Sequence, residues 1–247
     1  MPVVVAWCGV AVITGLALRI VPAPYGRHQR AGWGPRLADR TGWLVMESPA
    51  PLVFFALFFR GPHHDGLPAL LFLAMWMIHY VHRAWIYPFR RARPKAGAMP
   101  VAIALMGGGF CAINAYLNAR WIFALSGGYP ATWTTDPRLI AGTLLFLAGL
   151  ALNLHSDAVL RRLRRGCGAG YQVPYGGAYR WVSCPNYLGE LIEWTGWAVA
   201  TWSLAGLSFA LWTAANLVPR ALSHHDWYRR TFPCYPPRRR AILPLVL

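Results

Sequence analysis

A stripe of polar residues at helical spacing is the first feature of this sequence that carries chemistry. It consists of an amide, a carboxylate and two guanidiniums, at Asn153, Asp157, Arg161 and Arg164. Their spacings of four, four and three residues place them on one face of a helix. Such groups suit the amide, hydroxyls and phosphates of a dinucleotide. The alternative is a purely structural Asp–Arg pair within the helix.

A second stripe begins directly after Pro185. It contains Asn186, Glu190 and Glu193, at spacings of four and three residues, which again share one helical face. Two carboxylates this close on an otherwise apolar helix need hydrogen-bond donors. Ribose hydroxyls, a carboxamide or neighbouring arginines would supply such donors. The alternative is a structural hydrogen-bond network between helices.

Glu47 is the single residue that the sequence indicates most clearly as a catalytic candidate. It lies near the start of an apolar run, and no basic residue lies within one helical turn of it. A buried carboxyl group without a nearby cation tends to stay protonated and can then donate a hydrogen bond. We therefore expect Glu47 to polarise a carbonyl group of a substrate.

Tyr80 lies between two histidines, His79 and His82, at the end of another apolar run. No local carboxylate or cysteine completes a metal site around this histidine pair, so we predict no metal. Tyr80 is a candidate phenolic donor, with interfacial anchoring as the alternative. His224 and Tyr228 open the basic C-terminal segment, where the alternative role is contact with lipid headgroups.

Several common signatures are missing from the sequence. The one glycine-rich run, Gly166 to Gly170, lacks both the preceding strand and the spacing of a dinucleotide fingerprint, so we reject a Rossmann fold. The sequence contains neither a P-loop nor a Gly-x-Ser-x-Gly elbow. The five cysteines form no CxxC pair, and we expect neither a disulfide framework nor a zinc site.

The composition is that of a membrane protein. Of 247 residues, 56% are hydrophobic and 13 are Trp, and the mean hydropathy is +0.35, which is more apolar surface than a soluble domain of this length needs. The formal net charge of +16 would otherwise indicate nucleic acid. Because long apolar runs interrupt the basic residues, we expect contact with membrane lipids and no nucleic acid.

Apolar runs near the length of a membrane span predict seven transmembrane helices, at residues 2–20, 43–59, 67–87, 98–123, 137–158, 186–202 and 205–219. If the chain crosses the membrane seven times, nearly all of its 24 basic residues lie on one side of the membrane. Only Arg60, Arg120 and Arg138 lie on the other side. The positive-inside rule then puts the N-terminus outside and the C-terminus in the cytoplasm. We expect one all-α integral membrane domain over residues 1–247, acting as a monomer.

Several motifs in order resemble those of the steroid 5α-reductases. The C-terminal half supplies Asn153 to Asp157, Tyr171 to Gly177, Asn186 to Trp194, Ala221 to Tyr228 and Arg240 to Pro244. The N-terminal half supplies Tyr25 to His28, Glu47 to Ala50, His79 to Arg83 and Arg93-Pro94. The resemblance covers essentially the whole chain and is to a bacterial member of the family, in the inner membrane. One departure is Met46, where the steroid enzymes carry Gln.

The resemblance implies an NADPH-dependent oxidoreductase acting on a CH–CH group, with the cofactor bound from the cytoplasm and a steroid or steroid-like lipid as substrate. It implies that Glu47 and Tyr80 are catalytic and bind the 3-oxo oxygen. The residues that it implies for NADPH are Arg27, Arg83, Arg93, Asn153, Asp157, Arg164, Tyr171, Asn186, Glu190, His224 and Tyr228.

Other functions share parts of this pattern. The nearest is reduction of another enone or enoyl lipid, such as an enoyl thioester or a polyprenal. A methyltransferase of the isoprenylcysteine type also places a basic C-terminal region beside an Asn/Glu-bearing helix, but it would bind S-adenosylmethionine. A transporter is disfavoured because the polar residues gather at one membrane face. The upstream Glu47 and Tyr80 favour the reductase over the methyltransferase.

Overall fold

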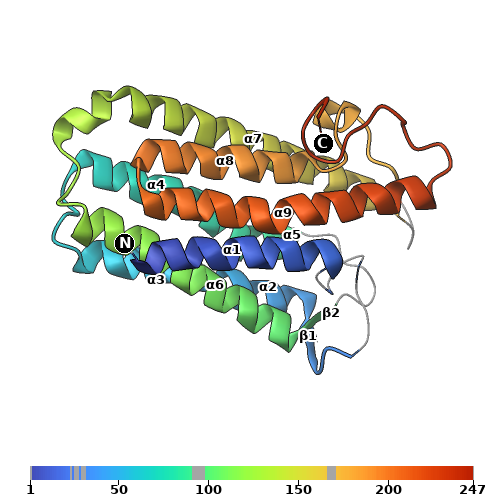
Figure 1. Ribbon diagram of the computed structural model, residues 1–247, viewed down its shortest axis with the longest axis horizontal. Helices are drawn as coiled ribbons and strands as arrows, with labels where there is room; N and C mark the ends of the chain where they lie inside the picture. Colours follow the sequence, from blue (N-terminus) through green and yellow to red (C-terminus); the bar gives the residue numbers. More distant parts are fainter. Residues whose placement is uncertain are drawn as a thin grey trace. The chain divides into compact units, whose positions relative to one another are not determined.

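The computed structural model describes residues 2–22, 24, 28, 32–90, 98–165 and 171–246, and helices dominate it (Figure 1). Two compact units divide the chain. Unit 1 comprises Met1–Ala23, Leu144–Ala198 and Leu207–Leu247, and unit 2 comprises Pro24–Thr143 and Val199–Gly206. Both predicted polar stripes belong to unit 1, and Glu47 and Tyr80 belong to unit 2.

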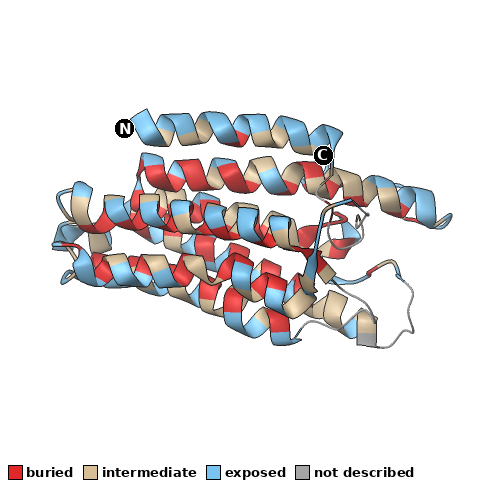
Figure 2. Cartoon of the chain, turned by 90° about the horizontal axis from the view of Figure 1, so that it is seen from below, coloured by how far each residue is buried: buried red, intermediate tan, exposed pale blue. Residues whose placement is uncertain are grey.

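Unit 1 contains α1 (Pro2–Ile20), α7 (Pro137–Arg165) from Leu144 onward, the 3₁₀ helix η5 (Gly177–Arg180), and most of α8 (Pro185–Thr201) and α9 (Leu204–Thr231). Helix α1 runs beside α9 (Figure 1), where the Trp212 indole N–H donates to the Trp7 carbonyl at 3.1 Å. Ala11 alone among the described α1 residues is buried, and Figure 2 shows this helix, at the label N, as mostly exposed. Such an apolar, exposed helix fits a lipid environment.

Unit 2 contains β1 (Arg36–Ala38), α2 (Asp39–Glu47), α3 (Pro49–Arg60), α4 (Leu67–Tyr80), the π-helical turn η2 (Val81–Ile86), α5 (Tyr87–Arg90), β2 (Ala98–Pro100), α6 (Val101–Arg120), a second π-helical turn η3 (Trp121–Leu125) and the 3₁₀ helix η4 (Ala131–Thr135). Its core is aromatic: the rings of Phe54 and Trp76 stack at 4.4 Å, and Phe123 meets Phe54 edge-on at 5.3 Å. These three side chains are fully buried.

Five stretches of helix in the described residues are long and apolar enough to cross a membrane: Pro2–Ile20, Asp39–Arg60, Leu67–Arg90, Val101–Leu125 and Pro137–Arg164. They correspond to the first five predicted spans. The last two predicted spans fall within α8 and α9, which are not among these five stretches. Helix α8 matches its predicted span closely, whereas α9 has 28 residues and continues to Thr231, well past the predicted end at residue 219. An integral membrane protein is thus supported by five helices, whereas the count of seven remains a prediction.

Besides helices, the described residues form a two-stranded antiparallel sheet and an isolated β-bridge between Val182 and Arg240. Arg36 pairs with Pro100 and Ala38 with Ala98, and the Val101 amide continues the pairing to the Pro35 carbonyl at 2.9 Å. The predicted span from residue 98 therefore starts three residues early, because Ala98–Pro100 is a strand. Proline lacks the amide N–H of a helix interior and is suited to the residue before a helix starts.

Asp136 caps the first turn of α7. Its carboxylate accepts the Arg138 side chain at 2.7 Å and the Arg138 backbone N–H at 2.8 Å, and these bonds lower its pKa from 3.8 to about 2. Because the folded-state pKa lies below the unfolded one, this stabilisation is complete above about pH 4 and is lost as the pH falls through about 2.

We therefore expect Asp136→Asn to lower the thermal unfolding midpoint by about 2 °C near neutral pH, since the site is solvent-screened. The difference from the unmodified protein should shrink as the pH falls from about 4 to about 2. Thermal unfolding followed across that range checks this, and a difference that stays constant with pH would contradict it.

Candidate active site

The two predicted polar stripes meet where α7 packs against α8. The Asn153 amide donates to the Asn186 carbonyl at 3.0 Å and to Glu190 Oε1 at 3.1 Å. The Asn186 amide donates to Asp157 Oδ1 at 3.2 Å. Asn153, Asp157 and Glu190 are each at most 8% exposed. A buried group of amides and carboxylates is therefore held in one place by facing helices.

Two glycines allow this close approach of α7 and α8. A β-carbon on Gly149 would lie 2.5 Å from the Gly189 carbonyl oxygen, and one on Gly189 would lie 2.6 Å from the Asn153 backbone nitrogen. Glycine at such a crossing lets two backbones approach to a distance that no other residue permits. This contact sets the spacing at which Asn153 reaches Glu190.

The arginines of the first stripe do not form the intrahelical pair that was the alternative. Asp157 accepts a hydrogen bond from Asn186. Arg161 forms no ion pair within the described part of the chain, where its buried Nη1 also lacks a hydrogen-bond partner. Arg164, one turn along, is partly exposed. The helix thus ends in guanidiniums that remain available to an anion.

His224 and Tyr228 are buried, at 7% and 3% exposure, so a headgroup-anchoring role does not suit their positions. His224 Nε2 lies 3.3 Å from the Tyr187 hydroxyl, which also accepts from Arg220 Nε at 3.0 Å. Tyr187 is not among the site residues predicted from the sequence. The 3.6-residue periodicity that places it beside the second stripe was the available signal.

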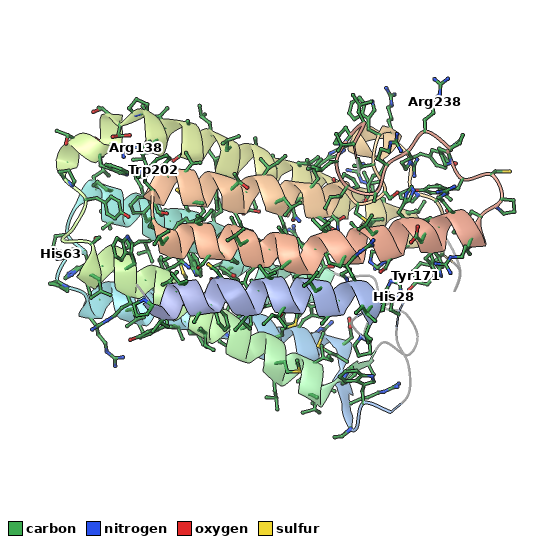
Figure 3. All side chains as sticks on the ribbon, in the orientation of Figure 1. His28, His63, Arg138, Tyr171, Trp202 and Arg238 are labelled. Atoms are coloured by element: carbon green, nitrogen blue, oxygen red, sulfur yellow. The ribbon has the colours of Figure 1, made fainter. Side chains whose placement is uncertain are left out.

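Tyr171 lies at the edge of unit 1 and is 44% exposed, as its labelled position in Figure 3 shows. Its ring meets Trp227 edge-on at 5.2 Å. Tyr171 is therefore a surface aromatic, unlike the buried Tyr228. The predicted cofactor residues Arg27 and Arg93 lie outside the described residues.

Glu47 ends α2 and lies beside a cation, so the expectation that no cation accompanies it is wrong. Arg83 Nε is 3.5 Å from Glu47 Oε1. The Arg83 guanidinium also lies over the rings of Trp43 and Tyr87, at 4.8 and 5.0 Å. Arg83 belongs to the π-helical turn η2, a distortion that is common at functional sites.

Tyr80, the last residue of α4, is 3% exposed. Its ring packs against Trp76 and His79, each at 4.9 Å. Such burial is inconsistent with interfacial anchoring of the ring. No group of three or more metal-ligating side chains occurs among the residues that the structure describes.

Helix α6 adds polar groups that are not among the site residues predicted from the sequence. The Cys111 thiol donates to Glu47 Oε2 at 3.8 Å. One and two turns further along, Asn114 and Asn118 are fully buried, and the Asn118 amide donates to Asn114 Oδ1 at 3.3 Å. The apolar run around them predicts a membrane span, and polar side chains inside a span are candidates for a functional role.

Proteins of similar sequence match this chain over nearly its whole length. The family model described as 3-oxo-5-alpha-steroid 4-dehydrogenase matches residues 97–247. The chain is 40% identical over 240 residues to steroid 5-alpha-reductase DET2 of Gossypium hirsutum, and the match covers 96% of this chain and 93% of that protein. The chain belongs to the steroid 5α-reductase family.

A mammalian relative agrees with this assignment. 3-oxo-5-alpha-steroid 4-dehydrogenase 1 of Homo sapiens is 40% identical over 225 residues, which cover 90% of this chain and 85% of that protein. The resemblance inferred from sequence motifs is thus confirmed at the level of the steroid 5α-reductase family. These relatives come from a plant and an animal, so the bacterial origin stays a prediction.

Met46, the departure from the family pattern, is part of the core of unit 2. It packs with Trp43, Met99 and Ala104, and a β-carbon on Gly107 would lie 2.5 Å from its Cγ. In this member of the steroid 5α-reductase family, an apolar side chain precedes the candidate catalytic Glu47. Its burial explains why an apolar residue is tolerated at this position.

Proposed function

We propose that this protein reduces the C4–C5 double bond of a 3-oxo-Δ4-steroid to the 5α-reduced 3-oxosteroid, with NADPH as the reductant. One observation carries the proposal. The chain is 40% identical, over at least 90% of its length, to a plant steroid 5-alpha-reductase and to a human 3-oxo-5-alpha-steroid 4-dehydrogenase. The buried polar clusters of α7 with α8 and of α2 with η2 support it. Residues 1–247 form one membrane-embedded reductase domain in this proposal.

The polar groups of unit 1 fit a dinucleotide. Asp157 and Glu190 offer buried carboxylate oxygens to ribose hydroxyls, and the orphaned Arg161 Nη1 offers a donor to phosphate. The residues that would hold NADPH are Asn153, Asp157, Arg164, Tyr171, Asn186, Glu190, His224 and Tyr228, together with Arg27, Arg83 and Arg93. NADPH, when bound, supplies the hydride that reduces the double bond at C5.

Glu47 and Tyr80 would bind the 3-oxo oxygen, where negative charge grows as the enone becomes an enolate. Two hydrogen-bond donors aimed at that oxygen stabilise the charge. The sequence predicts that Glu47 has no cation beside it, but the Arg83 guanidinium lies 3.5 Å from its carboxyl group. The role proposed for Glu47 therefore includes Arg83. If the Glu47 proton shifts toward the enolate oxygen, Arg83 stabilises the carboxylate left behind. A proton added at C4 then completes the reduction.

The membrane arrangement belongs to the same proposal. Seven spans, made by the five apolar stretches with α8 and α9, put the N-terminus outside and the C-terminus in the cytoplasm. Cofactor then enters from the cytoplasm and the lipid substrate from the membrane. We propose a monomer, in the inner membrane if the source is a bacterium.

The direct test is NADPH oxidation by the purified protein in detergent, with and without progesterone or testosterone, and with the product identified by mass spectrometry. We expect cofactor consumption that depends on the steroid, together with a product heavier by two hydrogen atoms. NADPH binding without reduction of either steroid would move the proposal to another enone or enoyl lipid. A protein that binds S-adenosylmethionine and no NADPH would overturn it.

A further inference from the structure

One face of α7 lies opposite the candidate active site and is largely exposed. Asn153 and Asp157 face α8, where they form hydrogen bonds with Asn186 and Glu190 (Figure 1). Half a turn around the helix lies a second stripe, at spacings of four, three, four, four and three residues. It consists of Leu144, Ala148, Ala151, His155, Val159 and Arg162, all exposed except the half-buried Val159. This stripe is separate from the candidate active site.

The stripe changes from apolar to basic along the helix. Leu144 is 64% exposed and belongs to the stretch Pro137–Arg164, which is long and apolar enough to cross a membrane. At a rise of 1.5 Å per residue, His155 lies about 16 Å beyond Leu144 along the helix, and Arg162 lies about 10 Å beyond His155. One leaflet contributes about 15 Å of the hydrocarbon core of a bilayer. The apolar part of the stripe therefore spans one leaflet, and its basic end reaches the headgroups.

An open hollow of about 440 Å³ lies at the basic end of the stripe. His155, Val159 and Arg162 line it, together with Tyr175 and Gly177 of the loop that follows α7. Gly177 has a φ angle of 50°, and a β-carbon there would lie 2.8 Å from His155 Nε2. Glycine thus allows the loop to pass close to the imidazole. The volume of the hollow lies within the range of ligand sites, which is about 300–1,000 Å³.

The basic groups of the hollow have no anionic partner within the protein. Among the described residues, neither Arg162 nor His155 has an ion pair or a hydrogen bond. All eight Asp and Glu residues lie in that part of the chain. Asp157, the one carboxylate of α7, accepts a hydrogen bond from Asn186 on the opposite face. The hollow therefore combines a positive potential with an apolar approach, which fits an amphipathic anion.

We propose that this face of α7 binds a phospholipid with an anionic headgroup. The phosphate accepts hydrogen bonds from the Arg162 guanidinium and the His155 imidazole. The small side chains of Ala148 and Ala151 leave room for an acyl chain along the helix. Tyr175, in the wall of the hollow, is 63% exposed, and tyrosine is enriched where membranes meet water. In the membrane arrangement proposed above, this lipid belongs to the cytoplasmic leaflet.

Thermal unfolding of the full-length protein in a neutral detergent tests the site. Phosphatidylglycerol, which is anionic, or phosphatidylcholine, which is zwitterionic, is titrated into the micelles. We expect phosphatidylglycerol to raise the unfolding temperature until one site is saturated, and phosphatidylcholine to leave it nearly unchanged. Native mass spectrometry of the same samples should show one retained phosphatidylglycerol. Equal effects of the two lipids would overturn the requirement for an anionic headgroup.

Two variants separate the charge of the hollow from its shape. Arg162→Gln should weaken phosphatidylglycerol binding about 10-fold, as loss of a hydrogen bond to a charged group does. Val159→Trp keeps the charge but fills the hollow, and it should weaken binding by a similar factor of about 10. Arg238→Gln is the matched control and should change binding by less than about 2-fold. Arg238 is an exposed arginine of the same unit that does not line the hollow (Figure 3).

Other outcomes would overturn the inference. If Arg238→Gln weakens phosphatidylglycerol binding as much as Arg162→Gln does, the lipid is attracted by diffuse surface charge and not by this site. If inorganic phosphate gives the same stabilisation and Val159→Trp has no effect, the ligand is a free phosphate. NADPH affinity should be the same in Arg162→Gln as in the unmodified protein, and a parallel loss of NADPH affinity would assign Arg162 to the cofactor instead.

Discussion

Glu47→Gln is expected to lower turnover by about two to three orders of magnitude while NADPH affinity stays close to that of the unmodified protein. A positioned acid contributes about 10² to 10⁴ to a rate. The amide keeps the shape of the side chain and can still donate a hydrogen bond, but it cannot release a proton to the enolate oxygen. It also leaves Arg83, 3.5 Å away, without a carboxylate partner.

Steady-state turnover with a 3-oxo-Δ4-steroid and a separate NADPH titration measure the two effects. Asp65→Asn is the matched control, because Asp65 is 86% exposed at the side chain and lies in the loop before α4. This control should have nearly unchanged turnover. A Glu47→Gln protein that loses NADPH affinity in proportion to turnover would contradict the assignment of Glu47 to the steroid carbonyl.

Gly149→Ala is expected to abolish most NADPH binding, even though it adds a single methyl group with no charge. The added carbon would lie 2.5 Å from the Gly189 carbonyl oxygen, and a backbone atom in a packed helix cannot shift cheaply. Overpacking of this kind costs about 1–3 kcal/mol or more. Moving α7 away from α8 would lengthen the hydrogen bonds of Asn153 with Asn186 and Glu190.

NADPH titration together with thermal unfolding checks this prediction, and Gly109→Ala provides the control. Gly109 lies in α6, where an added β-carbon would meet no atom within 4 Å. Alanine is the better helix former there, so stability should hold or rise slightly. If Gly149→Ala binds NADPH like the unmodified protein, the crossing of α7 and α8 does not position the cofactor residues.

The two catalytic candidates depend on a break in regular helix geometry. Helix α2 ends at Glu47, and Pro49 begins α3 after Ser48. On the other side, α4 gives way to the π-helical turn η2 directly after Tyr80. A π-helical turn holds an extra residue and so rotates the next part of the helix about its axis, and here Arg83 within the turn reaches Glu47. In a regular α-helix through residue 86, a different face of the helix would lie toward Glu47.

The sequence alone determined the features that depend on local spacing and composition. Apolar runs indicated the helices, and a periodicity near 3.6 residues grouped Asn153 with Asp157 and Asn186 with Glu190. The motifs also indicated the steroid 5α-reductase family. These inferences hold because membrane burial and helical periodicity are properties of neighbouring residues, so a short window of sequence contains the whole signal.

Only the tertiary structure decided which distant groups meet. Arg83 reaches Glu47 from a separate helical segment, and Cys111 reaches it across 64 positions of sequence. Arg239 is buried because Arg240 pairs with Val182, whereas its sequence context of consecutive arginines reads as a solvated tail. Such contacts depend on how helices and loops pack over long sequence separations, and no local periodicity encodes them.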